Sequence, residues 1–404
     1  MKSRVLIIVQ NLPVPFDRRV WLECQALISA GYGVAVVCPK GRGDPAYQVI
    51  DSVELHKYRP YAPGGSKFSF VAEYAHSFLA TAWTTLKARR SGRFAVIQAC
   101  NPPDIFWPLA MAFRAVEGTR FVFDHHDLCP ETFESRFAEG SSLLYRGLRF
   151  LERRTTRLAD HVISTNESYR RLVMARDGVK PDRVTVVRTG PDPDKLKAAE
   201  VVPSLRRGRP HLAAYIGVMG PQDGVDIVIK VAHFVVNTLK RTDISFTLIG
   251  SGDCFSELVA LRDQLKMGDF VEFTGRAPDE AVRDILSTAD IGLSPDPKNP
   301  LNDVSTMNKT MEYMVFGLPV VAFDLRETRV SAGDAAVYVQ PNDEQQYAEA
   351  IVALLDDEPR RELMGKIARE RVEQELAWDH QESTYLGVYK RVLGQAGAGR
   401  RTRA

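Results

Sequence analysis

The chain has few cysteines, no long apolar run and almost no excess of charge, and each shortage excludes a class of protein. Its 404 residues include five cysteines without a C-x-x-C pair, and no metal-ligand spacing joins them to the eight histidines. A disulfide framework and a zinc module are therefore not expected, and the thiols should be reduced and mostly in the core. A net charge of +2 gives no strong field for nucleic acid.

The apolar runs are too short for a signal peptide or a spanning helix. Val5–Val9 is shorter than the apolar core of about 7–15 residues in a signal peptide, and it predicts a strand. The longest nearly apolar window, 68–86, is interrupted by Glu73 and His76. An amphipathic helix with a basic end is the plainer interpretation, but its flank at 87–93 could meet anionic lipid headgroups. We expect a cytoplasmic protein, with peripheral contact at the inner face of the cell membrane as an open alternative.

Length and alternation predict two α/β domains. A chain of 404 residues is too long for one core, and short apolar runs alternate with helical patterns, as in doubly wound parallel sheets. The runs are 5–9, 34–37, 94–98, 120–123, 161–164 and 183–187, then 212–217, 246–249, 271–273, 291–294, 320–323 and 336–339. The predicted parts are a first domain at 1–197, a linker at 198–210, a second domain at 211–378, a C-terminal helix at 379–394 that returns to the first domain, and a basic tail at 395–404.

The segment 308–322 joins a polar helix start to Gly-Leu-Pro and an apolar strand. Asn308 and Lys309 lie at this start, where a helix offers amides and the positive end of its dipole to an anion. Glu312 follows one turn later, where its carboxylate can accept hydrogen bonds from a diol. The segment predicts a site for a phosphate and a ribose. The alternative is an ordinary helix–strand unit with a surface Lys–Glu pair.

The same segment resembles the nucleotide-sugar-binding segment of glycosyltransferase family 4, whose members are retaining enzymes of the GT-B fold. The resemblance implies two doubly wound Rossmann-like domains that face a cleft, with the donor on the second domain and the acceptor mainly on the first. It places Glu312 on the ribose of the donor. The donor substrate would be a nucleotide-diphosphate sugar, with no cofactor and no bound metal.

Loops of the second domain follow predicted strands and should lie at one edge of the sheet, where ligands bind in such folds. The candidate donor-binding residues are Gly217, Gly220, Gly250, Gly275, Arg276, Ser305, Asn308, Lys309 and Glu312. Val218 and Asp223 stand where many members of the family have an arginine and a lysine on the diphosphate. Val304 replaces the second glutamate of the family, and Asp303 beside it is the predicted stand-in. Lys309 and the amides before it are left for the diphosphate.

A His-Asp-x-x-Pro sequence in the first domain resembles a family loop whose histidine faces the sugar and the acceptor. The resemblance implies catalytic roles for His126 and Asp127, beside Lys309 and Asp303 of the second domain. A histidine that only packs in a strand-end loop is the alternative. The neighbouring His125 does not make this a metal site, because no third ligand is spaced for the pair.

The loop 13–20 lacks the glycine that is common in the family at this place. Arg18 or Arg19 could reach a phosphate or an anionic acceptor instead, since a guanidinium forms paired bonds with phosphate oxygens. The alternative is a helix-entry loop with Asp17 as the cap and with solvated arginines.

These features and the resemblance predict a glycosyltransferase that moves a sugar from a nucleotide-diphosphate sugar to an acceptor, and the resemblance implies that the transfer proceeds with retention. By resemblance, the acceptor is a lipid-linked saccharide for a cell-surface polysaccharide. Lys309 and the helix dipole would stabilise the leaving diphosphate. The alternatives are a nucleotide-sugar epimerase of the same architecture and a noncatalytic nucleotide-sugar-binding subunit, which the loss of two family cations would suit.

Overall fold

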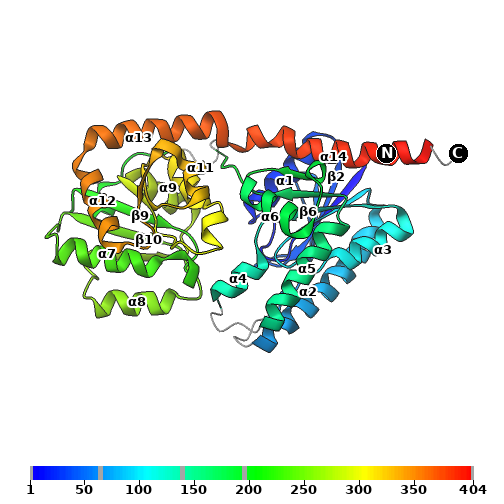
Figure 1. The fold of residues 1–404 in the computed structure, drawn as a ribbon, viewed down its shortest axis with the longest axis horizontal. Helices are drawn as coiled ribbons and strands as arrows, with labels where there is room; N and C mark the ends of the chain where they lie inside the picture. Colours follow the sequence, from blue (N-terminus) through cyan, green and yellow to red (C-terminus); the bar gives the residue numbers. More distant parts are fainter. Residues whose placement is uncertain (1–2, 62–66, 137–141, 193–197, 402–404) are drawn as a thin grey trace. The chain divides into compact units, whose positions relative to one another are not determined.

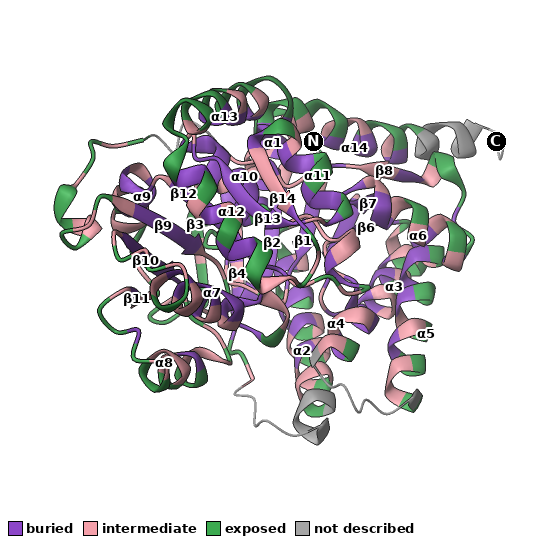
Figure 2. Cartoon of the chain, turned by 60° about the vertical axis from the view of Figure 1, so that its left-hand side comes forward, coloured by how far each residue is buried: buried purple, intermediate pink, exposed green. Residues whose placement is uncertain are grey.

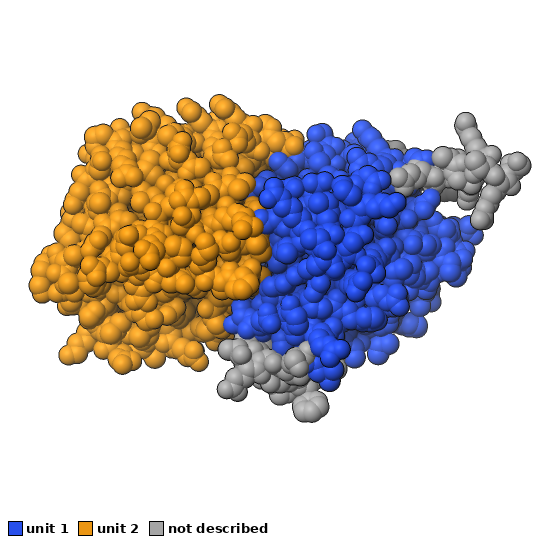
Figure 3. Space-filling model, viewed as in Figure 1, with its two compact units in different colours: residues 1–189, 381–404 blue, residues 190–380 orange. Residues whose placement is uncertain are grey.

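The computed structural model describes residues 3–61, 67–136, 142–192 and 198–401, with the backbone alone for 67–71, 136, 142 and 395–401. It divides into a first unit, 1–189 with 381–404, and a second unit, 190–380 (Figure 3). Each unit contains a mainly parallel sheet with helices packed on it (Figure 1). The predicted pair of doubly wound α/β domains is confirmed.

The sheet of the first unit has eight described strands in the order β3-β4-β2-β1-β5-β6-β7-β8. The strands are β1 Arg4–Ile8, β2 Gly33–Pro39, β3 Tyr47–Ile50, β4 Val53–Tyr58, β5 Val96–Cys100, β6 Arg120–His125, β7 His161–Ser164 and β8 Val184–Val186. Neighbours pair in parallel except β3 and β4, which are antiparallel. Strands β3 and β4 were not predicted from the sequence, because polar residues interrupt both strands at this edge of the sheet.

The helices of the first unit begin at polar caps where the sequence provides them. They are α1 Arg18–Ser29, α2 Lys67–Ala88, α3 Trp107–Glu117, α4 Cys129–Arg136, α5 Ser142–Leu158, α6 Glu167–Asp177 and most of α14 Trp378–Arg401. Asp17 caps α1, since its carboxylate accepts a hydrogen bond from the amide of Val20 at 3.1 Å. Helix α14 continues to Arg401, so the predicted basic tail is helical as far as the structure describes it.

The second unit has six described strands in the order β11-β10-β9-β12-β13-β14, all paired in parallel. The strands are β9 His211–Ile216, β10 Ile244–Ile249, β11 Val271–Gly275, β12 Ile291–Ser294, β13 Val320–Phe323 and β14 Ala336–Val339. The helices are α7 Val225–Asn237, α8 Phe255–Gln264, α9 Asp279–Thr288, α10 Asn308–Val315, α11 Arg326–Ala332, α12 Glu344–Asp356 and α13 Glu358–Arg371. Helices α7 and α8 lie side by side (Figure 1).

The segment 198–210, predicted as a linker, belongs to the second unit. The amide of Val202 donates to the hydroxyl of Thr288 at 3.0 Å, and Arg206 forms an ion pair with Asp290 at 2.8 Å. The basic residues that suggested a solvated linker therefore have partners within the unit.

The central strands are among the most buried elements of both units, whereas edge strands such as β3 and β11 are partly exposed (Figure 2). Every residue of β10 and of β5 is buried, as expected for parallel strands covered by helices on both faces. Polar groups that act on a ligand are consequently confined to the loops that follow the carboxyl ends of the strands.

Backbone hydrogen bonds join three such loops in the second unit. The amide of Gly217 donates to Ile249 at 3.0 Å, and that of Gly250 donates to Gly275 at 3.0 Å. The backbone at Gly250 has a φ of +137°, and a Cβ there would lie 1.9 Å from the carbonyl oxygen of Gly217. The loops after β9, β10 and β11 thus share one edge, and their close approach requires glycine at position 250.

The close approach at Gly250 gives a testable prediction. Gly250→Ala should lower the free energy of unfolding by about 3 kcal/mol or more, because both the positive φ and the contact with Gly217 oppose a side chain. Gly275→Ala is the matched control: its φ is +65° and nothing lies within 4 Å of the added Cβ, so about 1–2 kcal/mol is expected. Equal losses in urea titrations of the two variants would contradict a steric requirement.

Candidate functional site

Lys309 lies in the first turn of α10, and its buried ammonium is matched by carboxylates. The Nζ donates to Asp296 at 2.5 Å, lies 3.9 Å from a carboxylate oxygen of Asp223, and sits 5.0 Å from the centre of the Tyr215 ring. Burial alone would lower the pKa of Lys309, but the two carboxylates outweigh it and raise the pKa. The lysine is therefore a charged, partnered side chain and not an open cation.

Asp296 was not among the predicted site residues, although its loop follows a predicted strand at the expected edge of the sheet. It follows β12, is buried, and accepts a hydrogen bond from the hydroxyl of Ser294 at 2.8 Å. Asn302, also buried, donates from its amide to Pro297 at 2.8 Å and to Gln222 at 2.9 Å. These bonds join the loop after β12 to the loop after β9. An acid directly after a buried strand was the signal that could have identified Asp296.

Asp223, which stands where the family has a lysine, stabilises its own turn. Its carboxylate accepts a hydrogen bond from the amide of Gly220 at 2.9 Å and faces the ammonium of Lys309. The exposed Val218 contributes only its carbonyl here, which accepts from the hydroxyl of Tyr215 at 2.7 Å. Two carboxylates consequently surround one lysine at the edge where a diphosphate was expected.

The other predicted donor-site residues lie on the same unit, in different environments. Glu312 is half-buried on α10, and Asn308 is exposed at its first position. Arg276 is exposed in the loop after β11. The hydroxyl of Ser305 donates to the carbonyl of Leu301 at 2.7 Å, which ties the chain just before α10.

Asp303 makes contacts other than the predicted one to a sugar. Its carboxylate accepts a hydrogen bond from the amide of Arg326 at 3.1 Å, at the start of α11, and lies 3.5 Å from the Nζ of Lys298. Asp303 thus stabilises the start of α11.

Arg19 is the centre of the polar cluster in the first unit. Its buried guanidinium donates to Asp124 at 3.0 Å, to the carbonyl of Val187 at 3.0 Å and to the hydroxyl of Thr189 at 3.1 Å. The expectation that Arg19 could reach a phosphate is not met, because these groups already use its donors. Arg18, its neighbour on α1, is exposed.

His126 lies directly after β6 and contacts the same ion pair. Its Nε2 is 2.6 Å from Asp124 and 3.0 Å from the Nε of Arg19. A ring nitrogen carries either a proton or a lone pair. The Nε–H of Arg19 can donate to Nε2 when it has the lone pair, whereas Nε2 donates to Asp124 when it has the proton, so the two contacts compete for this nitrogen. Asn101 holds the loop: its Oδ1 accepts from the amides of His126 at 2.6 Å and Asp127 at 3.1 Å.

Charge partners separate the pKa values of two buried acids in this cluster. Burial alone would raise the pKa of Asp124, but the charges of Arg19 and His126 hold it well below its usual range. Burial raises the pKa of Glu23, and the nearby Asp124 raises it further. The pKa values of the two acids are therefore moved in opposite directions, although both lie beside Arg19. His125 faces the core, between the rings of Phe123 and Tyr169, and takes no part.

One group of metal-ligand side chains lies within the described residues, contrary to the expectation of none. The ligand atoms of Cys100, Asp124 and His126 lie within 4.8 Å of one another. Sequence spacing missed this group because β5 and β6 bring it together. The residues fit a metal poorly, since the guanidinium of Arg19 already lies 3.0 Å from Asp124 and supplies the positive charge.

Comparisons with known proteins identify the family. The model of Glycosyltransferase Family 4 matches residues 17–195, and the model of Glycosyl transferases group 1 matches residues 210–357. The chain belongs to the family 4-like glycosyltransferases. One match falls in the region of the Arg19 cluster and the other contains Lys309, Asp296 and Glu312.

Relatives and solved structures agree with this assignment. The D-inositol 3-phosphate glycosyltransferase of Acidothermus cellulolyticus is 27% identical over 251 residues, which are 59% of this chain and 54% of that protein. The chain therefore spans about half the length of the curated relatives it matches. Sucrose-phosphate synthase from Thermosynechococcus elongatus has a TM-score of 0.79 at 17% identity, with 98% of this chain and 100% of that chain covered. Anabaena HepE in complex with UDP-glucose has a TM-score of 0.71 at 13% identity, with 96% and 99% covered. At these identities the structures show the GT-B fold alone.

The pairing of Lys309 predicts a large effect on stability. Lys309→Met should lower the free energy of unfolding by about 3–5 kcal/mol, because Asp296 would be left buried without its cation. Lys298→Met removes a half-exposed lysine 3.5 Å from Asp303 and should cost at most about 1 kcal/mol. Chemical denaturation of both variants checks this. A Lys309→Met cost equal to that of Lys298→Met would show that the ion pair stabilises little.

Proposed function

We propose that the chain transfers a sugar, with retention, from a nucleotide-diphosphate sugar bound by the second unit to a lipid-linked saccharide bound mainly by the first. The observation that carries the donor part is the shared edge of the loops after β9, β10 and β11, with Lys309 at the start of α10. Glycine backbone, a helix N-terminus and a buried lysine are the groups that bind a diphosphate in such sheets.

The charge around Lys309 limits how the diphosphate is held. With Asp296 and Asp223 beside one ammonium, the local net charge is negative before the donor arrives. An ammonium has three N–H donors, so Lys309 can keep its bond to Asp296 and give another to a phosphate oxygen. Backbone amides and the α10 dipole then carry the rest of the stabilisation of the leaving group.

Glu312 is the proposed ribose ligand, because it lies one turn into α10 and is only half-buried. The neighbouring structure of HepE holds UDP-glucose, which makes a uridine donor the first to test. Asp303 remains the proposed sugar contact only if it exchanges its bond to the amide of Arg326 for a sugar hydroxyl.

His126 is the proposed residue at the acceptor. The tautomer we propose for the acceptor step has its proton on Nε2, directed to Asp124, and its lone pair on Nδ1, where it can accept a hydrogen bond from a hydroxyl. Asp127 would act through the same loop, which Asn101 fixes. Metal independence is part of the proposal, with the Arg19 guanidinium in the place a cation would take.

A lipid-linked acceptor requires access to a membrane surface. None of the helices in the described part of the chain is long and apolar enough to cross a bilayer. Helix α2 exposes Leu79, Trp83 and Leu86 at helical spacing, and the Nζ of Lys87 lies 5.4 Å from the centre of the Trp83 ring. An exposed apolar stripe with a basic end suits contact with anionic headgroups at the inner face of the membrane.

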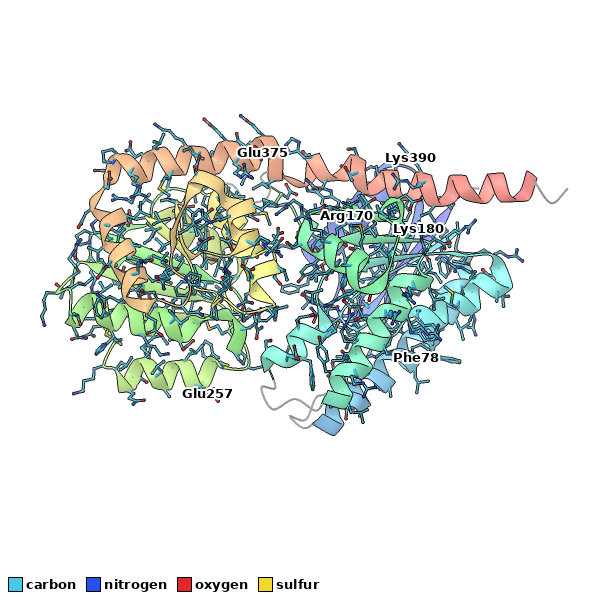
Figure 4. The ribbon with its side chains drawn as sticks, viewed as in Figure 1. Phe78, Arg170, Lys180, Glu257, Glu375 and Lys390 are labelled. Atoms are coloured by element: carbon cyan, nitrogen blue, oxygen red, sulfur yellow. The ribbon has the colours of Figure 1, made fainter. Side chains whose placement is uncertain are left out.

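The donor site is tested by calorimetric titration with UDP, GDP and ADP sugars. Glu312→Gln should weaken binding of the cognate donor by about 1.5–3 kcal/mol, since a hydrogen bond between a carboxylate and a diol is lost with little change in volume. Glu257→Gln, on the exposed side of α8 (Figure 4), is the matched control and should bind as the unaltered protein does. Unchanged affinity in Glu312→Gln would remove this residue from the site.

The reaction is tested by following labelled sugar from the donor into a lipid extract, with a chelator present throughout. We expect transfer in the unaltered protein and a fall in turnover of about 100-fold in His126→Ala, with donor affinity retained.

Three results would contradict the proposal. Donor conversion without acceptor would indicate an epimerase. Donor binding without transfer or hydrolysis would indicate a noncatalytic subunit. Activity that is lost with chelator and restored by a divalent ion would show that transfer requires a metal.

A further inference from the structure

Gln98 lies at the centre of a buried hydrogen-bond chain in the first unit. The residue is on β5 and is fully buried. Its Nε2 donates to Glu23 at 2.7 Å and lies 3.3 Å from Asp124. Its Oε1 accepts hydrogen bonds from the hydroxyls of Tyr385, at 3.0 Å, and Tyr389.

The two tyrosines come from α14, far along the chain from the cluster they reach. Both are fully buried, with ring centroids 5.2 Å apart and hydroxyls 3.1 Å apart, one turn from each other on the helix. Lys390, labelled in Figure 4, is exposed on the same helix. The two tyrosines therefore lie on the buried face of α14.

The two hydroxyls fix the orientation of the Gln98 amide. Together they use both lone pairs of Oε1, which directs the NH₂ group towards Glu23 and Asp124. A rotated amide would place its oxygen against an ionised carboxylate, which is unfavourable in a dry interior. The tyrosine hydroxyls on one side and the two carboxylates on the other thus favour the same orientation of the Gln98 amide.

The chain continues from Asp124 to the proposed acceptor residue. Asp124 binds Arg19 at 3.0 Å and His126 at 2.6 Å. We propose that Tyr385 and Tyr389 are positioning residues for the transfer reaction: through Gln98 they hold Asp124, and through Asp124 they hold the ring of His126. This inference rests on the proposed role of His126.

Paired substitutions separate this role from simple packing. Tyr385→Phe with Tyr389→Phe keeps both rings and removes both donors. We expect turnover to fall about tenfold or more with the KM for the donor nearly unchanged, because the donor binds the second unit. Tyr385→Phe alone leaves one donor on Oε1 and should lose clearly less.

Tyr347→Phe is the matched control for the loss of a buried hydroxyl. Tyr347 is fully buried in the second unit, and its hydroxyl donates to the carbonyl of Val321 at 2.6 Å. Its variant should lose a similar free energy of unfolding per hydroxyl, about 1 kcal/mol, and should keep its turnover. This comparison shows whether a general loss of stability explains the kinetic result.

A readout that does not need activity keeps the inference separate from the proposed function. The ring carbon–proton resonances of the eight histidines can be followed by NMR, with His126 assigned by comparison with His126→Ala. In the double tyrosine variant the His126 signal should shift or broaden, while Tyr347→Phe leaves it in place. An unmoved His126 signal, or a turnover equal to that of Tyr347→Phe, would overturn the inference. If the signal moves but the unaltered protein transfers no sugar, the tyrosines still orient His126 and it is the proposed function that fails.

Discussion

Both candidate sites depend on buried cations that are matched by buried carboxylates. Arg19 with Asp124 and Lys309 with Asp296 are each almost inaccessible to water, and neither member of either pair could be buried alone without a large cost in free energy. Each cation joins loops that follow different strands. The ion pairs therefore fix the loop edges of the two sheets before any ligand binds.

The fixed side chains of the two ion pairs favour catalysis, because they are oriented before the reaction begins. Groups that are already oriented do not have to reorganise when charge develops in a transition state. In the first unit the ion pair of Arg19 and Asp124 orients His126. In the second unit the ion pair of Lys309 and Asp296 holds the lysine side chain next to Gly217. The replacement of family cations by Val218 and Asp223 means that backbone amides and the α10 dipole must stabilise more of the leaving diphosphate.

Local patterns in the sequence predicted the fold and part of the site. Most strands could be located because a parallel sheet buries both faces, which produces short apolar runs such as those of β1 and β10. The helix start at Lys309 and the loop at His126 were recognisable from their own segments.

What the sequence could not show were partners brought together from distant segments. The pairing of Lys309 with Asp296, the inward direction of Arg19 and the two tyrosines on Gln98 all depend on how the strands and α14 assemble. The contacts of the segment 198–210 could not be predicted for the same reason, because Asp290, the partner of Arg206, lies in another part of the sequence.

The central claim is that the donor binds the loop edge of the second unit, and hydrogen exchange of the backbone amides tests it most directly. The full chain would be compared with and without a saturating nucleotide diphosphate. The account predicts slower exchange in the loops 217–224 and 250–253 and at the start of α10, with no change at 101–104 and 124–131. Slower exchange at 101–104 and 124–131, without change in the second unit, would contradict it.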